Sequence, residues 1–126
     1  MEILPTAVRT DSRAFQDNRA RMLTLVNELH ARLNDARGGG DEKSLARHRA
    51  QGKLPVRERL SRLLDPKTAL FELSPLAACD LYDNDAPAAG LITGIGQVSG
   101  QDVMIVANHA TVKGGTYYPL TVKKHI

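Results

Sequence analysis

The sequence of 126 residues contains no tryptophan, only two phenylalanines and three tyrosines, and a single cysteine, Cys79. With so few aromatic residues, we expect neither an aromatic ligand cage nor a base-stacking platform. One cysteine excludes an intramolecular disulfide and suits a reducing compartment. No uncharged apolar run approaches the roughly 18 residues needed to span a bilayer. The opening MEILPTAVRTDSRAF has no secretory signal and no clear transit peptide, so we expect a cytoplasmic, bacterial-like protein without membrane association.

Residues that commonly form catalytic or metal centres are also scarce. The Gly38–Ser44 segment lacks the glycine that a phosphate-binding loop places before its lysine, and Gly94-x-Gly96 lacks the third glycine of a dinucleotide fingerprint. Neither paired carboxylates nor a Ser/His/Asp set stands out. None of the four histidines has a partner at metal-ligand spacing: His30, His48, His109 and His125. We therefore assign no catalytic residue to this chain and expect no metal.

The net charge of +3 is unevenly distributed along the chain. Residues 1–66 hold 13 Lys and Arg against 9 Asp and Glu, whereas residues 67–126 hold 4 against 5. A basic half rich in arginine raises the possibility of nucleic-acid binding. However, acids and bases alternate without forming a continuous basic tract, which is typical of solvated helix faces. We therefore favour solvated helices and expect no nucleic-acid partner.

Residues 1–66 have the apolar periodicity of helices. The pattern predicts a helix from Arg13 to Arg37 that Asp11 or Ser12 caps and the run Gly38–Gly40 ends. A second short helix follows Asp41, and a third begins with Pro55 in its first turn and ends at Asp65-Pro66. The third helix is expected to bury Val56, Leu60, Leu63 and Leu64.

The pattern changes to strands after residue 66. A short strand is predicted at 70–73, and 91–98 and 103–107 form an antiparallel hairpin around Ser99-Gly100. Because the second hairpin strand is apolar on both faces, it should be covered on both sides. A last helix with Pro119 in its first turn can be capped by Thr116. We divide the chain into a helical arm, 1–66, and the start of a mixed α/β domain, 67–126.

One segment combines several features of a ligand site. The apolar strand 103–107 runs into Asn108-His109-Ala110-Thr111-Val112-Lys113-Gly114-Gly115-Thr116 and then a helix. A glycine pair next to a helix N-terminus exposes backbone N–H groups toward an anionic or carbonyl oxygen, and Lys113 adds a positive charge. A purely structural turn accounts for this pattern equally well.

Two stretches carry a family resemblance. The first is RHRAQGKLPVRERL from Arg47 to Leu60, followed by Leu63-Leu64-Asp65-Pro66 and Phe71-Glu72-Leu73. The second runs from GLITGIG at Gly90 through IVAN at Ile105 to ATVKGGTYYPLTVKKH at Ala110. Together they resemble the carboxyltransferase (beta) subunit of biotin-dependent acyl-CoA carboxylases, and KGGTYYP most resembles the methylcrotonoyl-CoA carboxylase branch. His109 differs from the acidic residue usual in that family.

The resemblance implies a helical arm followed by the first β-β-α units of a crotonase-like domain, present here only in part. It also implies transfer of a carboxyl group from carboxybiotin to an acyl-CoA, with enolates held by backbone N–H pairs. In the family those glycine-rich turns lie beyond the last position of this chain, so we expect the 126-residue chain to be inactive alone. The implied partners are a biotin-carrying alpha subunit and other beta subunits.

The resemblance suggests binding roles for a few residues. Lys113, Gly114, Gly115 and Thr116 would border the acyl-CoA pocket. Arg57, in the run Arg57-Glu58-Arg59, is expected either to join an i, i+4 charge network that ties the helical arm to the core or to contact a CoA phosphate. Two other hypotheses stay open, namely a non-catalytic helical interaction module and a carboxylase homologue acting on propionyl-CoA or geranyl-CoA.

Overall fold

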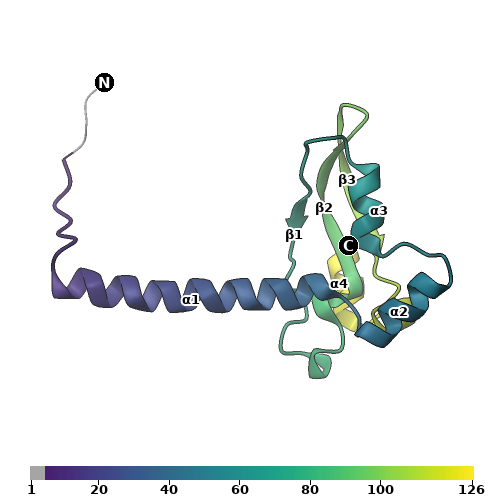
Figure 1. Cartoon of the computed structure of the whole chain (residues 1–126), viewed down its shortest axis with the longest axis horizontal. Helices are drawn as coiled ribbons and strands as arrows, with labels where there is room; N and C mark the ends of the chain where they lie inside the picture. Colours follow the sequence, from purple (N-terminus) through teal and green to yellow (C-terminus); the bar gives the residue numbers. More distant parts are fainter. Residues whose placement is uncertain (1–4) are drawn as a thin grey trace. The chain divides into compact units, whose positions relative to one another are not determined.

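The computed structural model describes residues 5–126 and is a mixed α/β structure (Figure 1). The chain divides into two compact units, one ending at Ala31 and the other running from Arg32 to Ile126, so the boundary in the sequence falls within the first helix. All strands and all helices after the first one lie in the second unit. The described fold of that unit therefore contains every candidate site considered below.

Helix α1 spans Arg13–Gly38 and confirms the predicted first helix. Its cap is Ser12, whose Oγ accepts a hydrogen bond from the Phe15 N–H at 3.2 Å. Gly39 ends the helix with a φ of 76°, a left-handed conformation that favours glycine. In the first unit the helix leaves several large apolar side chains exposed: Met22, Leu23, Leu25 and Leu29.

Helix α2 spans Glu42–Ala50 and begins as predicted, because the Asp41 carboxylate accepts a hydrogen bond from the Ser44 N–H at 2.6 Å. Helix α3 spans Val56–Leu63, with Pro55 just before it as its N-cap residue. Val56 and Leu60 are buried as expected, but the expectation that Leu63 is buried is wrong, since it is 49% exposed.

Leu64 packs on the core where Leu63 does not. Its Cδ2 occupies the space that a side chain at Gly96 would need. Leu64 has left the helix and has extended backbone, with a ψ of 148°, so that helical spacing no longer determines where its side chain points. The two neighbouring leucines are therefore separated, one toward solvent and one toward the core.

The sheet has three antiparallel strands in the order β1-β2-β3. β1 is Phe71–Leu73, β2 is Leu91–Val98 and β3 is Gln101–Asn108, so the predicted hairpin is confirmed with slightly longer strands. The Asp65 carboxylate accepts hydrogen bonds of 2.7 Å from the N–H groups of both turn residues, Ser99 and Gly100. Asp65 therefore holds the hairpin turn, while α3 ends at Leu63, before the expected end at Asp65-Pro66.

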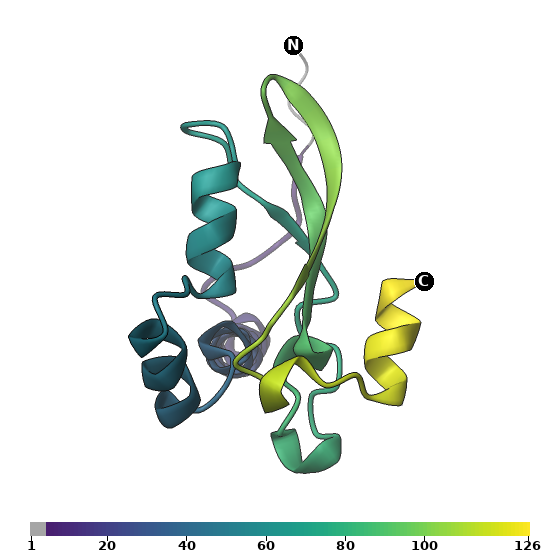
Figure 2. The same cartoon turned by 90° about the vertical axis from the view of Figure 1, so that its right-hand side faces the viewer.

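One face of the sheet forms the main core. Ile92 of β2 and Ile105 of β3 pack against Val56 and Leu60 of α3. Figure 2 shows α3 and the final helix, α4 (Pro119–His125), on opposite sides of the hairpin. The other face remains partly exposed among the described residues, contrary to the expected two-sided cover; its exposed side chains are Phe71, Ile95, Met104 and Val106.

Candidate functional site

The connection between β1 and β2 builds the wall of a pocket. Residues 74–90 contain an unusual density of left-handed backbone, mostly without glycine. Such conformations cost energy for residues with a Cβ and often occur where a binding surface is shaped. The residues other than glycine with positive φ in this connection are Ser74, Ala78, Asp80, Tyr82, Asp83, Asn84, Ala88 and Ala89.

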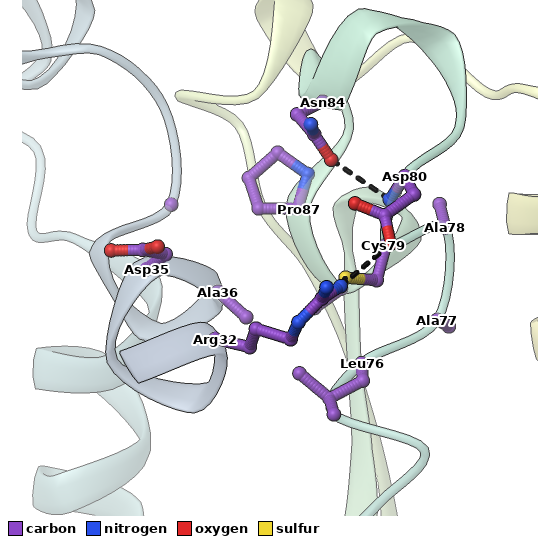
Figure 3. A pocket seen from close by; sticks show the side chains of 12 residues that line it. Arg32, Asp35, Ala36, Leu76, Ala77, Ala78, Cys79, Asp80, Asn84 and Pro87 are labelled. Atoms are coloured by element: carbon purple, nitrogen blue, oxygen red, sulfur yellow. Dashed lines mark hydrogen bonds and ion pairs between the residues drawn. The ribbon is translucent and has the colours of Figure 1, made fainter. Parts of the chain in front are cut away.

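The first pocket, here the Arg32 pocket, lies between this connection and the C-terminal part of α1, with a volume of about 380 Å³ (Figure 3). Leu76, Ala77 and Pro87 form part of its apolar lining. The guanidinium of Arg32 donates hydrogen bonds to the Asp80 carboxylate at 2.6 Å and to the Cys79 sulfur at 3.1 Å. The pocket therefore combines an apolar floor with a charged pair and a thiol.

Cys79 is half-buried, lines the Arg32 pocket and contacts a guanidinium. The contact depends on an arginine 47 positions earlier in the chain. No local pattern in the sequence predicts that proximity.

The second pocket, here the Lys113 pocket, also has a volume of about 380 Å³ and shares Gly39, Asn84 and Pro87 with the first. Its lining brings together two basic side chains, Arg47 and Lys113, and two acidic ones, Asp41 and Asp85. Because the charges balance, a bound anion would have to compete with the carboxylates for the two cations. This polar lining contrasts with the more apolar floor of the Arg32 pocket.

The ion pair between Lys113 and Asp85 dominates the electrostatics of the Lys113 pocket. Lys113 Nζ lies 2.7 Å from an Asp85 carboxylate oxygen, and this hydrogen bond and charge raise the pKa of Lys113 above its usual value. The pKa of Asp41 is lowered because its carboxylate accepts the Ser44 N–H at the start of α2. At neutral pH Lys113 and Asp41 are therefore both charged.

The predicted glycine turn is present, but its backbone groups are arranged differently from our expectation. Lys113, Gly114 and Gly115 are all left-handed, with φ of 44°, 69° and 85°. The Gly115 N–H donates to Val112 O at 2.8 Å, and the Thr116 hydroxyl donates to Lys113 O at 2.8 Å. These bonds close the turn on itself, so Lys113 is the member of the predicted set best placed to meet a ligand.

Thr116 does not cap the last helix, so that expectation is wrong. Tyr118 is the N-cap residue of α4, and its N–H donates to Thr121 Oγ1 at 3.1 Å. Pro119 opens the helix as expected. The helix begins two residues later than the Thr116 cap would require because the Thr116 hydroxyl is engaged within the Lys113 turn.

Arg57 lies outside the lining of both pockets. Its two terminal nitrogens donate to the Glu72 carboxylate at 2.9 and 3.0 Å, and its Nε donates to Arg37 O at 3.3 Å. This bidentate geometry joins α3, β1 and the end of α1. Arg57 therefore connects the helical arm to the core, but its partner lies 15 positions away and not at the i, i+4 spacing that we expected.

The Lys113 pocket also depends on close packing at the junction of α1 and α2. A Cβ at Gly39 would collide with the His109 ring, and a Cβ at Gly40 would collide with the backbone carbonyl of Thr111. The Gly40 N–H donates to Thr111 Oγ1 at 3.3 Å, and that hydroxyl lies 3.0 Å from His109 Nδ1. Two glycines thus allow the helical segments to meet the end of β3.

His109 is only 3% exposed. Burial lowers the pKa of His109 to about 4, and the positive charges of Arg57 and Arg59 contribute to the same shift. His109 is therefore neutral at pH 7. A neutral ring fits the position, because the Thr111 hydroxyl can donate to an unprotonated Nδ1.

The structure adds several pocket residues that sequence reasoning did not single out. Arg47 belongs to the first stretch that carried the family resemblance, so its position was a usable signal. The others become neighbours only through the fold: Arg32, Ser44, Asp80 and Asp85. Among residues 5–126, no three His, Cys, Asp or Glu side chains gather in a way that could hold a metal ion.

Comparison with known proteins decides the family. The family model for the carboxyl transferase domain matches residues 47–126. The chain belongs to the carboxyl transferase domain family. It is 55% identical over 113 residues to the biotin-dependent 3-methylcrotonyl-coenzyme A carboxylase beta1 subunit of Mycobacterium tuberculosis, covering 90% of this chain and 21% of that protein. It is 46% identical over 124 residues to the mitochondrial methylcrotonoyl-CoA carboxylase beta chain of Arabidopsis thaliana, covering 98% and 21%.

A solved carboxyltransferase structure shows the same fold. The beta subunit of P. aeruginosa geranyl-CoA carboxylase superposes with a TM-score of 0.75 at 31% identity, covering 96% of this chain and 23% of that one. The expected crotonase-like carboxyltransferase fold is thereby confirmed. The chain spans about a fifth of the length of the curated relatives it matches. The match to the carboxyl transferase domain includes Arg47 and Lys113 but begins after Arg32.

Proposed function

We propose that this chain contributes to the carboxyltransferase (beta) subunit of a biotin-dependent acyl-CoA carboxylase. Such a subunit moves a carboxyl group from carboxybiotin to an acyl-CoA, here 3-methylcrotonoyl-CoA, as in leucine catabolism. The 55% identity with the M. tuberculosis 3-methylcrotonyl-coenzyme A carboxylase subunit carries this proposal. The lower identity of 31% with the geranyl-CoA enzyme favours the methylcrotonoyl substrate.

Acyl-CoA is the ligand that we assign to the joined pockets. Lys113 and Arg47 offer positive charges to phosphate groups, and the apolar floor of the Arg32 pocket offers space to an uncharged part of the molecule. We retain Lys113, Gly114, Gly115 and Thr116 as the border of this pocket, with Lys113 making the charged contact. Lys113 and Gly114 belong to the lining of the Lys113 pocket, whereas Gly115 and Thr116 adjoin them in the chain without lining either pocket. For Arg57 we favour the network with Glu72 over a CoA phosphate contact, since Arg57 lines neither pocket.

Biotin would supply the activated carboxyl group when a partner subunit delivers it. The side chains at the Lys113 pocket carry full charges, which suit the charged parts of an acyl-CoA and not the uncharged ring system of biotin. We therefore derive no step through biotin from these residues and assign none of them a catalytic role. We further propose a biotin-carrying alpha subunit and other beta subunits as partners, a cytoplasmic location, and a division into an arm of residues 1–66 and a domain beginning at 67.

A chimera tests the proposed function. The first fifth of the M. tuberculosis beta1 subunit is replaced by this complete chain, and the chimera is assembled with its biotin-carrying partner. We expect biotin-dependent carboxylation of 3-methylcrotonyl-CoA in preference to propionyl-CoA and geranyl-CoA, measured by fixation of labelled bicarbonate. The 126-residue chain alone should be inactive. A chimera that assembles but carboxylates none of the three substrates contradicts the proposal.

Lys113 gives a more local prediction in the same chimera. Lys113→Ala removes one charge-assisted contact to an anionic group, so the KM for 3-methylcrotonyl-CoA should rise about tenfold with little change in kcat. The exposed Lys123 of α4 provides a matched control, because Lys123→Ala removes the same charge outside the pocket lining. Equal KM values for the two variants would contradict the pocket assignment.

A non-catalytic helical interaction module remains the second candidate function. The exposed apolar residues of α1 within the first unit favour it: Met22, Leu23, Leu25 and Leu29.

None of the helices described in residues 5–126 has the length and apolar composition of a membrane span. An α1 variant whose chimera folds like the unmodified chimera but no longer assembles with its partner subunits would assign this helix a docking role.

A further inference from the structure

The turn Pro87–Gly90, which precedes β2, has a strained backbone. Ala88, Ala89 and Gly90 are successive left-handed residues, with φ of 53°, 56° and 67°. Both alanines are buried, at 2% and 0% exposure. Left-handed backbone is disfavoured for any residue with a Cβ, and single residues are its usual extent. Contacts from outside the turn must therefore stabilise it.

Helix α4 supplies most of those contacts. Lys124 Nζ donates hydrogen bonds to Ala88 O at 2.9 Å and to Leu91 O at 2.6 Å. Thr121 Oγ1 donates to Ala89 O at 2.7 Å, and Thr121 is fully buried. The two side chains are three positions apart and so lie on one face of the helix. Helix α4 thus holds the Ala88 and Ala89 carbonyl oxygens of the turn and the Leu91 carbonyl oxygen at the start of β2. The Gly90 carbonyl oxygen accepts the His109 N–H at 2.9 Å.

The same turn lines the pockets of the candidate site. Pro87 belongs to both pockets, and Ala88 belongs to the Arg32 pocket. Neither Thr121 nor Lys124 lines a pocket, so any influence on a ligand passes through the turn. Substitution of Thr121 or Lys124 would therefore move the pocket wall, although neither residue itself lines a pocket.

We propose that Thr121 and Lys124 are positioning residues that hold the left-handed turn and thereby set the wall of the Arg32 pocket. The proposal rests on the proposed function only for the identity of the ligand, an acyl-CoA. The partly buried ammonium of Lys124 is costly, and burial lowers the pKa of Lys124 to about 8, with Glu72 opposing and Arg57 reinforcing that shift. A lysine kept at such a position is consistent with a specific structural task.

Amide hydrogen exchange by NMR tests the proposal in the complete chain. The Ala89 and Leu91 N–H groups donate to Ala86 O and Ala88 O and so report on the turn itself. Lys124→Met and Thr121→Val should each accelerate exchange at these two amides by roughly tenfold or more, with little change in the β2–β3 ladder. Lys123→Met is the matched control, since it removes the neighbouring exposed lysine of the same helix.

Glycine substitution in the turn distinguishes positioning from general stability. Ala88→Gly together with Ala89→Gly removes the steric cost of the left-handed backbone, so adding Lys124→Met should then change exchange at Leu91 by less than about threefold. This background also serves if Lys124→Met alone does not fold. The proposal is overturned by equal acceleration throughout the sheet, by unchanged exchange in the turn, or by failure to fold even in the glycine background.

Titration with coenzyme A separates this proposal from the proposed function. We expect Lys124→Met to weaken coenzyme A binding at least fivefold and Lys123→Met to leave it unchanged. In the glycine background, adding Lys124→Met should change the affinity by less than about twofold relative to that background itself. If the unmodified chain and the chimera both fail to bind coenzyme A, the proposed function fails. The exchange rates of the turn then still decide whether Thr121 and Lys124 hold it.

Discussion

Replacing Gly40 by alanine should destabilise the second unit by roughly 3 kcal/mol, as expected for forced overpacking against atoms that cannot easily move. The added Cβ would collide with the carbonyl group of Thr111 rather than with the end of a flexible side chain. Either the junction of α1 and α2 or the segment after β3 must shift. The hydrogen bond from the Gly40 N–H to Thr111 Oγ1 would be lost in the process.

Gly38 provides the matched control for this substitution. It is the last residue of α1, and a Cβ there meets nothing within 4 Å. Gly38→Ala should therefore be neutral or stabilise the chain by about 0.5–1 kcal/mol, because alanine loses less backbone entropy in a helix. Urea denaturation of both variants measures the difference. Equal stabilities for the two would show that the two segments do not pack as described.

The free energy of unfolding should fall by about 3 kcal/mol between pH 6.5 and pH 4 through His109 alone. Burial lowers the pKa of His109 from 6.5 to about 4 in the folded chain. Within this window the unfolded chain binds a proton that the folded chain does not, so acid favours unfolding. Above pH 6.5 the histidine is neutral in both states and contributes no pH dependence. Below pH 4 its contribution stops growing.

The difference between two unfolding curves isolates this effect. The free energies of unfolding of the unmodified chain and of His109→Gln are measured at several pH values from 7.5 to 4. The part of the dependence of this free energy on pH that is due to His109 should disappear in the variant. Contributions from acidic groups such as Asp41 are common to both proteins and cancel. His125→Gln, at an exposed position on α4, should retain the slope of the unmodified chain. A slope that persists in His109→Gln would exclude His109 as its source.

Both predictions concern the same contact, the packing of the α1–α2 junction on the end of β3. Gly39 lies against the His109 ring, and Gly40 and Thr111 meet directly. Gly39, Gly40 and Thr111 also line the Lys113 pocket. The added methyl group of Gly40→Ala or the protonation of His109 should therefore alter the Lys113 pocket as well as the stability of the chain. Coenzyme A titration of the same variants can measure the effect on the pocket.

Local patterns in the sequence were sufficient to predict most of the secondary structure. The extent of α1, the start of α2 at Asp41 and the hairpin around Ser99-Gly100 depend on periodicity, capping and turn chemistry, which act over a few residues. The resemblance of 47–60 and 90–125 to carboxyltransferase subunits identified the family. The same reasoning placed Lys113 beside a turn, and the structure shows that side chain at a pocket.

Tertiary structure decided the features that depend on distant segments. The Arg57–Glu72 pair spans 15 positions, the contact of Gly40 with Thr111 spans 71, and that of Lys124 with Ala88 spans 36. Periodicity cannot predict such contacts, because they arise only when elements pack. The neutral state of His109 and the left-handed backbone of Ala88 and Ala89 also arise only from the packing of distant segments. What the sequence by itself determined is the family and the helices and strands; the pockets, the buried charges and the stabilised turn follow from packing, where long-range contacts offset the local costs of burial and strain.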